Sequence, residues 1–262
     1  NLIDRNLDLV QTEASLFSIF KEHLDGNVTS GKKTYADHAQ ILFDTKDPTG
    51  EEIHFLGEVY EGVMNKALSN LYEKSRENYS EEAVFNRLIS IYQNQPKKTV
   101  KSLETLQGGQ YSTPVPMSFV AQKLLLGNDQ PAAGYQVLEP TIGNGSLVNN
   151  LPNAAIYGVE LDQDRLAIAR LDPSIQVENG DANKVDFKTL FKQPEGFDYV
   201  IANPPFGKLE WSEKFYDVLK VSKLDHAIAL KALAARKDHG RTVLILNTDG
   251  IYSKGEAEGS SK

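Results

Sequence analysis

Cysteine is absent from the 262 residues of this chain, which excludes disulfides, thiolate metal sites and covalent chemistry at a cysteine. Long apolar runs are absent too, since none approaches the roughly 20 residues that a membrane-spanning helix needs. No signal-peptide pattern opens the sequence, so we expect a cytoplasmic protein with no membrane partner. The five histidines are scattered without the spacing of metal ligands, and we expect no metal site.

Positive charge is also scarce. Lysine and arginine together number 28, against 36 aspartates and glutamates, which gives a formal net charge of −8. A protein that binds nucleic acid by itself usually carries an excess of positive charge. Either nucleic acid is not a partner of this chain, or the contacts to phosphates come from a local patch, another domain or another subunit.

The spacing of apolar residues divides the chain into two regions. In the first hundred or so residues they recur at helical spacing, at residues 16–24, 53–68 and 83–92. We therefore expect a helical N-terminal domain over residues 1–108.

From residue 109 onward, short apolar runs alternate with helical stretches. The runs predict strands at residues 135–139, 155–160, 175–178, 199–202 and 242–246, and the stretches between them predict helices at residues 115–126, 162–170 and 225–237. This alternation indicates an α/β fold, a doubly wound and mostly parallel sheet covered on both faces, over residues 109–262. Ligands bind such sheets beyond the carboxyl ends of the strands, so these ends are the candidate site.

A glycine-containing loop closes the first expected strand and is expected to open a helix, in the order Glu139-Pro140-Thr141-Ile142-Gly143-Asn144-Gly145-Ser146. Glycines allow a tight turn and a close approach of the backbone to a ligand, although a plain turn from a strand into a helix explains them as well. Glu160 ends the next expected strand. An acid roughly twenty residues after such a loop is where a ribose is bound, and a solvated carboxylate is the alternative interpretation.

A ligand with an amino-acid end fits this loop better than a ligand with a pyrophosphate. A dinucleotide loop needs a third glycine where this chain has Val148, and Glu139 would repel a pyrophosphate but hold an ammonium group. S-adenosylmethionine, with a ribose and an amino-acid end, fits these residues. Asp181, after the third expected strand, would accept a hydrogen bond from the adenine amino group. A turn in which Asp181 caps a helix is equally compatible with the sequence.

The fourth expected strand ends in Asn203-Pro204-Pro205-Phe206. Neither proline has an N–H group for a strand ladder, so the strand stops at Asn203. The result is a rigid turn that carries a carboxamide and an aromatic ring at the end of the strand.

Together these strand ends resemble those of adenine-N6 DNA methyltransferases, in the same order along the chain. A further element, Gln110-Tyr111-Ser112-Thr113-Pro114, lies just before the first strand and looks like the F/Y-x-T-P element of the gamma class. That class includes the modification subunits of type I restriction systems and related phage and plasmid methylases. The resemblance covers roughly residues 109–247 and implies the Rossmann-like fold of S-adenosylmethionine-dependent methyltransferases.

The resemblance also implies roles for individual residues. The cofactor pocket would be lined by Tyr111, Thr113 and Pro114. The methionine part would lie beside Thr141, Gly143 and Gly145. Glu160 would bind the ribose, Leu161 would pack on the adenine ring, and Asp181 with the backbone of Ala182 would bind the adenine edge.

The turn at Asn203 would carry the chemistry. The exocyclic amine of adenine is a poor nucleophile because its lone pair is delocalised into the ring. Two acceptors, the Asn203 side-chain oxygen and the Pro204 carbonyl, would localise the lone pair and stabilise the developing charge. Pro205 would keep the turn rigid, and Phe206 would stack on an adenine flipped out of double-stranded DNA. Cytosine-C5 methylation needs a cysteine and is excluded.

Other interpretations of the sequence stay open. Methyltransferases of guanine-N2 in ribosomal RNA and of glutamine in release factors have similar turns, although they lack the Tyr-x-Thr-Pro segment. A non-catalytic cofactor-binding domain of a larger DNA-modification protein is the third alternative. The sequence after the fifth expected strand lacks the two further strands of the family fold and a target-recognition domain. We therefore expect a catalytic domain truncated at its C-terminal end, with a specificity domain or subunit outside this chain.

Overall fold

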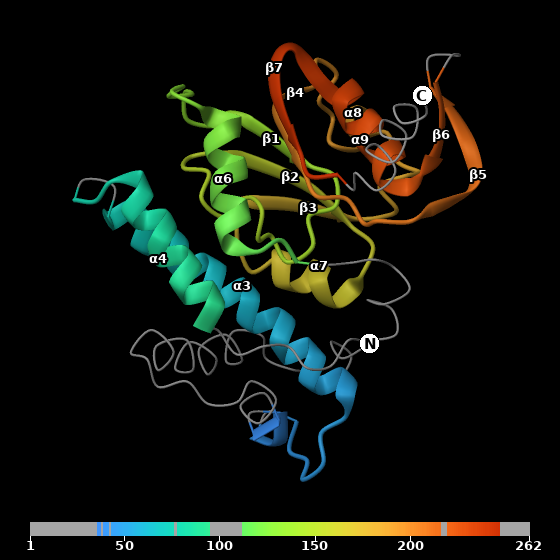
Figure 1. The fold of residues 1–262 in the computed structure, drawn as a ribbon. Helices are drawn as coiled ribbons and strands as arrows, with labels where there is room; N and C mark the ends of the chain where they lie inside the picture. Colours follow the sequence, from blue (N-terminus) through green and yellow to red (C-terminus); the bar gives the residue numbers. More distant parts are fainter. Residues whose placement is uncertain are drawn as a thin grey trace, which may run out of the picture.

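The centre of the computed structural model, which describes residues 36–37, 39–41, 43–75, 78–94, 112–215 and 219–246, is a five-stranded sheet (Figure 1). The strand order is β3-β2-β1-β4-β7, and every neighbouring pair is parallel. The strands are β1 (Gln136–Glu139), β2 (Ala155–Glu160), β3 (Ile175–Asn179), β4 (Phe197–Ala202) and β7 (Arg236–Leu244). The predicted doubly wound α/β fold is therefore confirmed.

Helices cover both faces of this sheet. Val137 and Leu138, adjacent in β1, are fully buried and point to opposite faces, each into its own core. The core around Val137 includes residues of α6 and α7, and the core around Leu138 includes residues of α8 and α9. These helices are α6 (Val115–Leu126), α7 (Gln163–Ala169), α8 (Phe187–Leu190) and α9 (Leu224–Ala235). Because both faces are covered, the inner strands β2 and β4 are apolar along most of their length, and the polar residues Glu160 and Asn203 lie at or directly after their carboxyl ends.

The local sequence explains where the helices begin. Asp162 caps α7, because its Oδ1 atom accepts hydrogen bonds of 2.9 Å from the backbone N–H groups of Asp164 and Arg165. Proline lies in the first turn of α6, where its missing N–H group costs nothing. The predicted helices at residues 115–126, 162–170 and 225–237 thus correspond closely to α6, α7 and α9.

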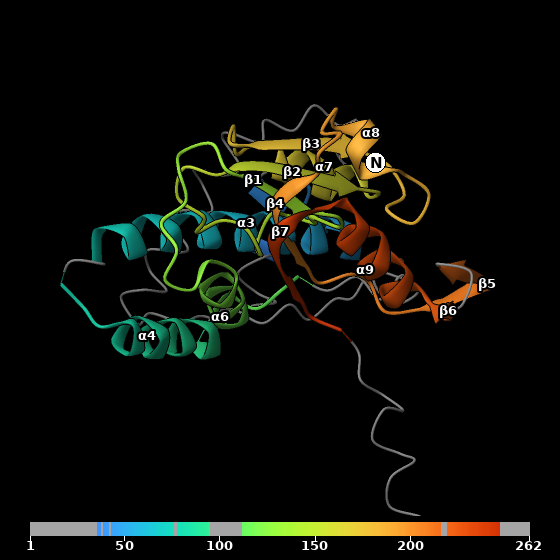
Figure 2. The same cartoon turned by 90° about the horizontal axis from the view of Figure 1, so that it is seen from above.

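The helical N-terminal region contributes α3 (Gly50–Ser75) and α4 (Glu81–Asn94), where apolar spacing predicted helices at residues 53–68 and 83–92. The helix predicted at residues 16–24 lies outside the described residues. Figures 1 and 2 show α3 and α4 on the side of the sheet that α6 and α7 cover. One core joins residues of α3 and α4 to Val115 and Phe119 of α6 and Ile168 of α7. The helices α3 and α4 therefore pack directly against helices of the α/β region.

The structure differs from the sequence prediction after β1. A helix was expected to follow the glycine loop, but residues 140–150 form consecutive turns, as in the hydrogen bond of 2.9 Å from Gly145 N–H to the Ile142 carbonyl. Gly143 and Gly145 have φ angles of +57° and +83°. This left-handed backbone interrupts a right-handed helix.

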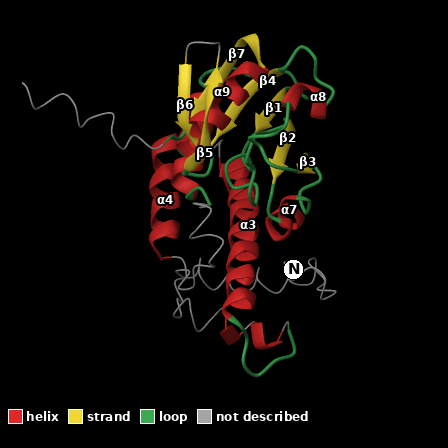
Figure 3. Cartoon of the chain, turned by 90° about the vertical axis from the view of Figure 1, so that its right-hand side faces the viewer, coloured by secondary structure: helices red, strands yellow, loops and turns green. Residues whose placement is uncertain are grey.

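Two elements were not predicted. The short helix α8 precedes β4, and an antiparallel hairpin of β5 (Lys208–Phe215) and β6 (Leu219–Lys223) follows the turn at Asn203. Figure 3 shows the hairpin next to α9, at the edge of the molecule. In the described part of the chain, no helix has the length and apolar character needed to cross a membrane.

Candidate active site

A cavity of about 360 Å³ lies at the carboxyl ends of β1, β2, β3 and β4. The chain runs outward from β1 to β3 in one direction and returns to β4 on the other side of β1. The cavity therefore lies at the switch point of the sheet, where ligands of this fold class bind, and its size is typical of a small-molecule site.

Most residues predicted for the site line this one cavity, although they come from separate strand ends. They are Thr113, Glu139, Thr141, Gly143, Glu160, Leu161, Asp181, Ala182, Asn203, Pro204, Pro205 and Phe206. Two predicted residues do not line it: Pro114, the N-cap residue before α6, and Gly145, where a side chain would point at Ile175. Tyr111 lies outside the described residues.

Glu139, at the end of β1, is a buried acid of the cavity with a strongly raised pKa. Its side chain is buried, and its Oε1 atom accepts a hydrogen bond of 3.3 Å from the Thr141 hydroxyl. Among the described residues, its Oε2 atom finds no hydrogen-bond partner. Burial raises the pKa of Glu139 to about 8, against the opposing effect of the backbone N–H groups of Thr141 and Asn203. The nearby Glu160 raises it further. A buried oxygen without a partner is suited to a ligand that donates hydrogen bonds and carries positive charge.

Glu160, at the end of β2, is held by the backbone on both sides. Its Oε2 atom accepts a hydrogen bond of 2.8 Å from Gly143 N–H, and its Oε1 atom accepts one of 2.8 Å from Asp162 N–H. Burial raises its pKa, while Arg165 and the two backbone donors favour the charged form. Each carboxylate oxygen keeps a second lone pair, so Glu160 fixes the glycine loop and still has acceptors for a diol.

Asn203, directly after β4, contacts the segment that precedes α6. Its Nδ2 atom donates a hydrogen bond of 3.0 Å to the Oγ1 atom of Thr113. Because the amide nitrogen is bound in this way, the Oδ1 atom is the free acceptor of the carboxamide. The turn at Asn203 and the Thr-Pro segment were predicted from separate motifs, and this hydrogen bond joins them at the wall of the same cavity.

The residues after β2 and β3 form the rim of the cavity. Leu161 has 59% of its surface exposed, which is unusual for a leucine and leaves its side chain free to cover a ring. Asp181 is half-buried, and its Oδ1 atom accepts a hydrogen bond of 2.9 Å from Asn183 N–H. Asp181 thus forms the turn of the alternative interpretation while it also lines the cavity.

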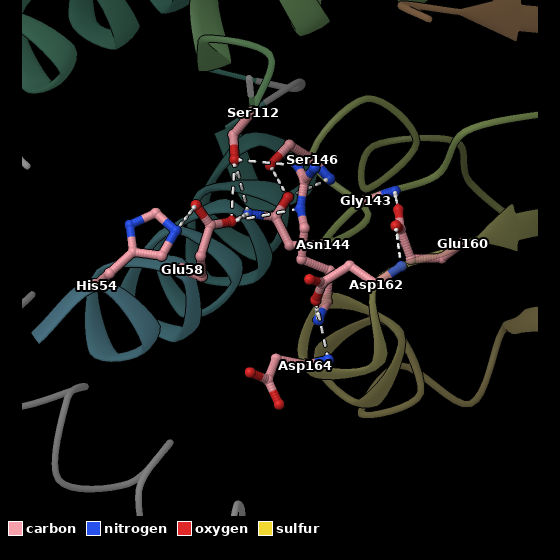
Figure 4. A network of polar contacts seen from close by, with 10 residues as sticks. His54, Glu58, Ser112, Gly143, Asn144, Ser146, Glu160, Asp162 and Asp164 are labelled. Carbon is pink, nitrogen blue, oxygen red and sulfur yellow. Dashed lines mark hydrogen bonds and ion pairs between the residues drawn. The ribbon is translucent and has the colours of Figure 1, made fainter. Parts of the chain in front are cut away.

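Sequence reasoning missed a polar network behind the glycine loop (Figure 4). Glu58 of α3 accepts hydrogen bonds of 3.3 Å from the Ser112 hydroxyl and 3.4 Å from Asn144 Nδ2, and it pairs with Arg165 of α7 at 3.5 Å. Gln122 of α6 donates a further hydrogen bond of 2.8 Å to a carbonyl of the loop, that of residue 147. Ser112 and Asn144 lie within motifs that were recognised, but no local signal marks Glu58 as more than a helix residue.

The cavity suits a cationic ligand better than an anionic one. Three acids line it, namely Glu139, which is mostly protonated near neutral pH until a cation binds, Glu160, and Asp181, which pairs with Lys184 at 3.2 Å. The cations on its lining are Arg165, which faces acids on α3, and the exposed Lys208. Within the described ranges, no group of His, Cys, Asp or Glu side chains could hold a metal ion. An ammonium or sulfonium group fits this charge distribution.

Comparison with known proteins then gives the family. The family model described as N-6 DNA methylase matches residues 98–262. The chain belongs to the N-6 DNA methylase family. Its members are methyltransferases that use S-adenosylmethionine, the cofactor that the sequence predicted and that the acidic cavity fits. The matched segment contains β1 to β7 and every residue of the predicted site, whereas α3 and α4 precede it.

Solved structures of methyltransferases resemble this chain at low sequence identity. A protein from Listeria monocytogenes assigned to the class I S-adenosylmethionine-dependent methyltransferases has 14% identity and a TM-score of 0.46, with 93% of this chain and 76% of that chain covered. The rRNA methyltransferase AviRa from Streptomyces viridochromogenes has 12% identity, a TM-score of 0.37 and coverage of 52% and 75%. The Thermus thermophilus 16S rRNA N2 G1207 methyltransferase, in complex with AdoMet and guanosine, has 21% identity, a TM-score of 0.37 and coverage of 53% and 36%. A sequence search of curated proteins found no match.

Proposed function

We propose that this chain transfers a methyl group from S-adenosylmethionine to the N6 amine of adenine in DNA. The observation that best supports this proposal is the hydrogen bond of 3.0 Å between Asn203 and Thr113. It fixes a carboxamide at the wall of a cavity that Glu139, Glu160 and Asp181 also line. A carboxamide acceptor beside an acidic pocket is what methylation of an amine requires.

The cofactor would bind along the strand ends. Glu139 would receive the ammonium group, since its buried Oε2 atom has no hydrogen-bond partner among the described residues. Glu160 would bind the ribose hydroxyls, and Leu161 would cover one face of the adenine ring. Asp181 and the backbone of Ala182 would bind the edge of that ring. Gly143 would bring the loop backbone close to the methionine part.

The turn at Asn203 would activate the target amine for methyl transfer. When bound, S-adenosylmethionine supplies an electrophilic methyl group on a sulfonium sulfur. The Asn203 Oδ1 atom and the Pro204 carbonyl would accept hydrogen bonds from the two N–H groups of the target amine, which localises its lone pair on nitrogen. Both acceptors would stabilise the positive charge that develops there. Pro204 and Pro205 limit the movement of the turn, so the acceptors are positioned before the substrate arrives.

The target base would enter the cavity from outside the duplex. Phe206 is half-buried at the cavity wall and would stack on a flipped adenine. With a net charge of −8, the chain has few cations to hold DNA phosphates. A specificity domain or subunit outside this chain would therefore supply most of the DNA affinity, and we expect slow methylation by the chain alone.

Methyl transfer from labelled S-adenosylmethionine tests this proposal. The chain would be incubated at low salt with double-stranded DNA, single-stranded DNA, RNA and protein, and the methylated nucleosides would be identified by mass spectrometry. We expect label in DNA, as N6-methyladenine. Label found only in guanine of RNA, or only in protein, would refute the choice of substrate. A chain that binds the cofactor but labels none of these polymers would refute the catalytic assignment.

A further inference from the structure

A buried polar cluster joins α3 to the glycine loop from behind the cavity. Glu58, only 8% exposed, lies in α3 and contacts residues of three other segments. It accepts a hydrogen bond from Ser112, ahead of α6, and one from Asn144, within the loop. It also pairs with Arg165 in α7. Figure 4 shows Glu58, Ser112 and Asn144 together on the side of the loop that faces α3.

The cluster extends directly to the backbone that lines the cavity. A side-chain carbon at Gly143 would come within 2.6 Å of the Arg165 guanidinium, so Arg165 lies against the loop. Asn144 Nδ2 also donates to Ser112 at 3.2 Å, and Arg165 Nη2 lies 3.5 Å from the same hydroxyl. Glu58 raises the pKa of Arg165 and thus helps to keep this buried guanidinium charged. Without Glu58, the Arg165 guanidinium, the Ser112 hydroxyl and the Asn144 amide would lose the carboxylate oxygen that all three contact.

We propose that Glu58 is a positioning residue of the cofactor site, although it precedes residues 98–262, the segment that matches the family. It holds Arg165, Ser112 and Asn144 in place, and through them the backbone at Gly143. The N-terminal helix α3 then helps to position the backbone of the cofactor site and does not form a separate unit. This inference rests on the proposed assignment of the cavity as the S-adenosylmethionine site.

Two effects of Glu58 on cofactor binding follow. Glu58→Gln keeps an acceptor for Ser112 but removes the charge that faces Arg165, and we expect about tenfold weaker binding of S-adenosylmethionine. Cofactor binding should also protect the backbone amides of α3 near Glu58 from hydrogen exchange, because the loop and the helix are coupled. This protection should be lost in Glu58→Gln.

The test is isothermal titration of the full chain with S-adenosylmethionine, together with hydrogen exchange with and without the cofactor. Glu81→Gln is the matched control, because Glu81 of α4 pairs with Lys123 of α6 and joins the same two regions away from the cavity. That control should leave both the affinity and the exchange protection unchanged. Asp181→Ala, on the cavity rim, should weaken binding independently of α3.

The outcomes separate this inference from the proposed function. Weaker binding in Glu58→Gln and Asp181→Ala, but not in Glu81→Gln, supports the inference. Weaker binding in Asp181→Ala alone overturns the role of Glu58 and leaves the site assignment intact. Unchanged binding in both variants overturns the site assignment and the inference with it. If Glu58→Gln does not fold, Ser112→Ala is the substitute, and because Ser112 also lines the cavity, hydrogen exchange decides: the inference predicts reduced protection of α3 by the cofactor, and wild-type protection overturns it.

Discussion

Thr113 and Asn203 are 90 residues apart in the sequence and are joined by a hydrogen bond of 3.0 Å, from Asn203 Nδ2 to Thr113 Oγ1. Thr113 is buried, at 7% exposure, and belongs to the segment that leads into α6. Asn203 ends β4. The bond therefore sets which atom of the Asn203 carboxamide is free to act as an acceptor in the cavity.

Replacing Thr113 tests whether this bond orients Asn203. Thr113→Val keeps the shape of the side chain but removes the hydroxyl, so the Asn203 amide group loses its acceptor. We expect the rate of methyl transfer to fall roughly tenfold, in line with the loss of one buried hydrogen bond. The KM for S-adenosylmethionine should change little. Thr113→Ser keeps the hydroxyl and should retain most of the rate; equal losses in both variants would show that packing, not the bond, matters.

Proton release on cofactor binding tests the role of Glu139. With a pKa of about 8, Glu139 is mostly protonated in the free protein at neutral pH. At about pH 6.5, below the usual α-amine pKa of about 7.7 to 8.0, an incoming ammonium group would displace that proton. We expect titrations in buffers of different ionisation enthalpy to show release approaching one proton per cofactor. Glu139→Gln should release none and bind roughly tenfold or more weakly, whereas equal release in both proteins would contradict the assignment.

Glu139 should also make the free energy of unfolding depend on pH. Its pKa is about 8 in the folded chain and near the ordinary value of 4.5 in the unfolded chain. Between these values the folded state holds a proton that the unfolded state releases, so stability from this group is full below 4.5 and is lost as pH rises to 8. Relative to Glu139→Gln, wild type should lose roughly 3 to 5 kcal/mol between about pH 5 and pH 8. Denaturant unfolding at both pH values measures this, and parallel curves would refute it.

Leu161 offers a test of the adenine-binding rim that leaves folding unaffected. Its side chain is 59% exposed, so Leu161→Ser should change the free energy of unfolding by less than about 0.5 kcal/mol. Because it would remove the apolar cover of the adenine ring, we expect about tenfold weaker binding of S-adenosylmethionine. Leu124 of α6 is 62% exposed and does not line the cavity, so Leu124→Ser is the control. Similar affinities in the two variants would show that Leu161 does not contact the cofactor.

The strand ends could be found from the sequence because they combine two strong signals. Each is a short apolar run, which a parallel sheet buries on both faces, followed by a polar residue or a turn. Glu139, Glu160 and Asn203 stand out in this way, and the topology of the fold brings them together.

Other features depend on packing that the sequence does not express. Glu58 lies in a helix where a glutamate usually faces solvent, but it is buried in contacts with Ser112, Asn144 and Arg165, which are distant in the sequence. The hairpin of β5 and β6 was missed because residues 208–223 contain no Gly, Pro or Asn to mark a turn. After the glycine loop, residues 146–150 form turns rather than the expected helix, and the positive φ angles of Gly143 and Gly145 within the loop are likewise not expressed by a local pattern.

The most direct test of the central claim compares wild type with Asn203→Ala for the formation of N6-methyladenine in double-stranded DNA. We expect wild type to produce N6-methyladenine slowly. Asn203→Ala should produce at least about a hundredfold less, since it removes an acceptor for the charge that develops in the transition state. Its affinity for S-adenosylmethionine should fall less than tenfold, or about 1.4 kcal/mol. N6-methyladenine formed at the wild-type rate by Asn203→Ala would contradict the mechanism.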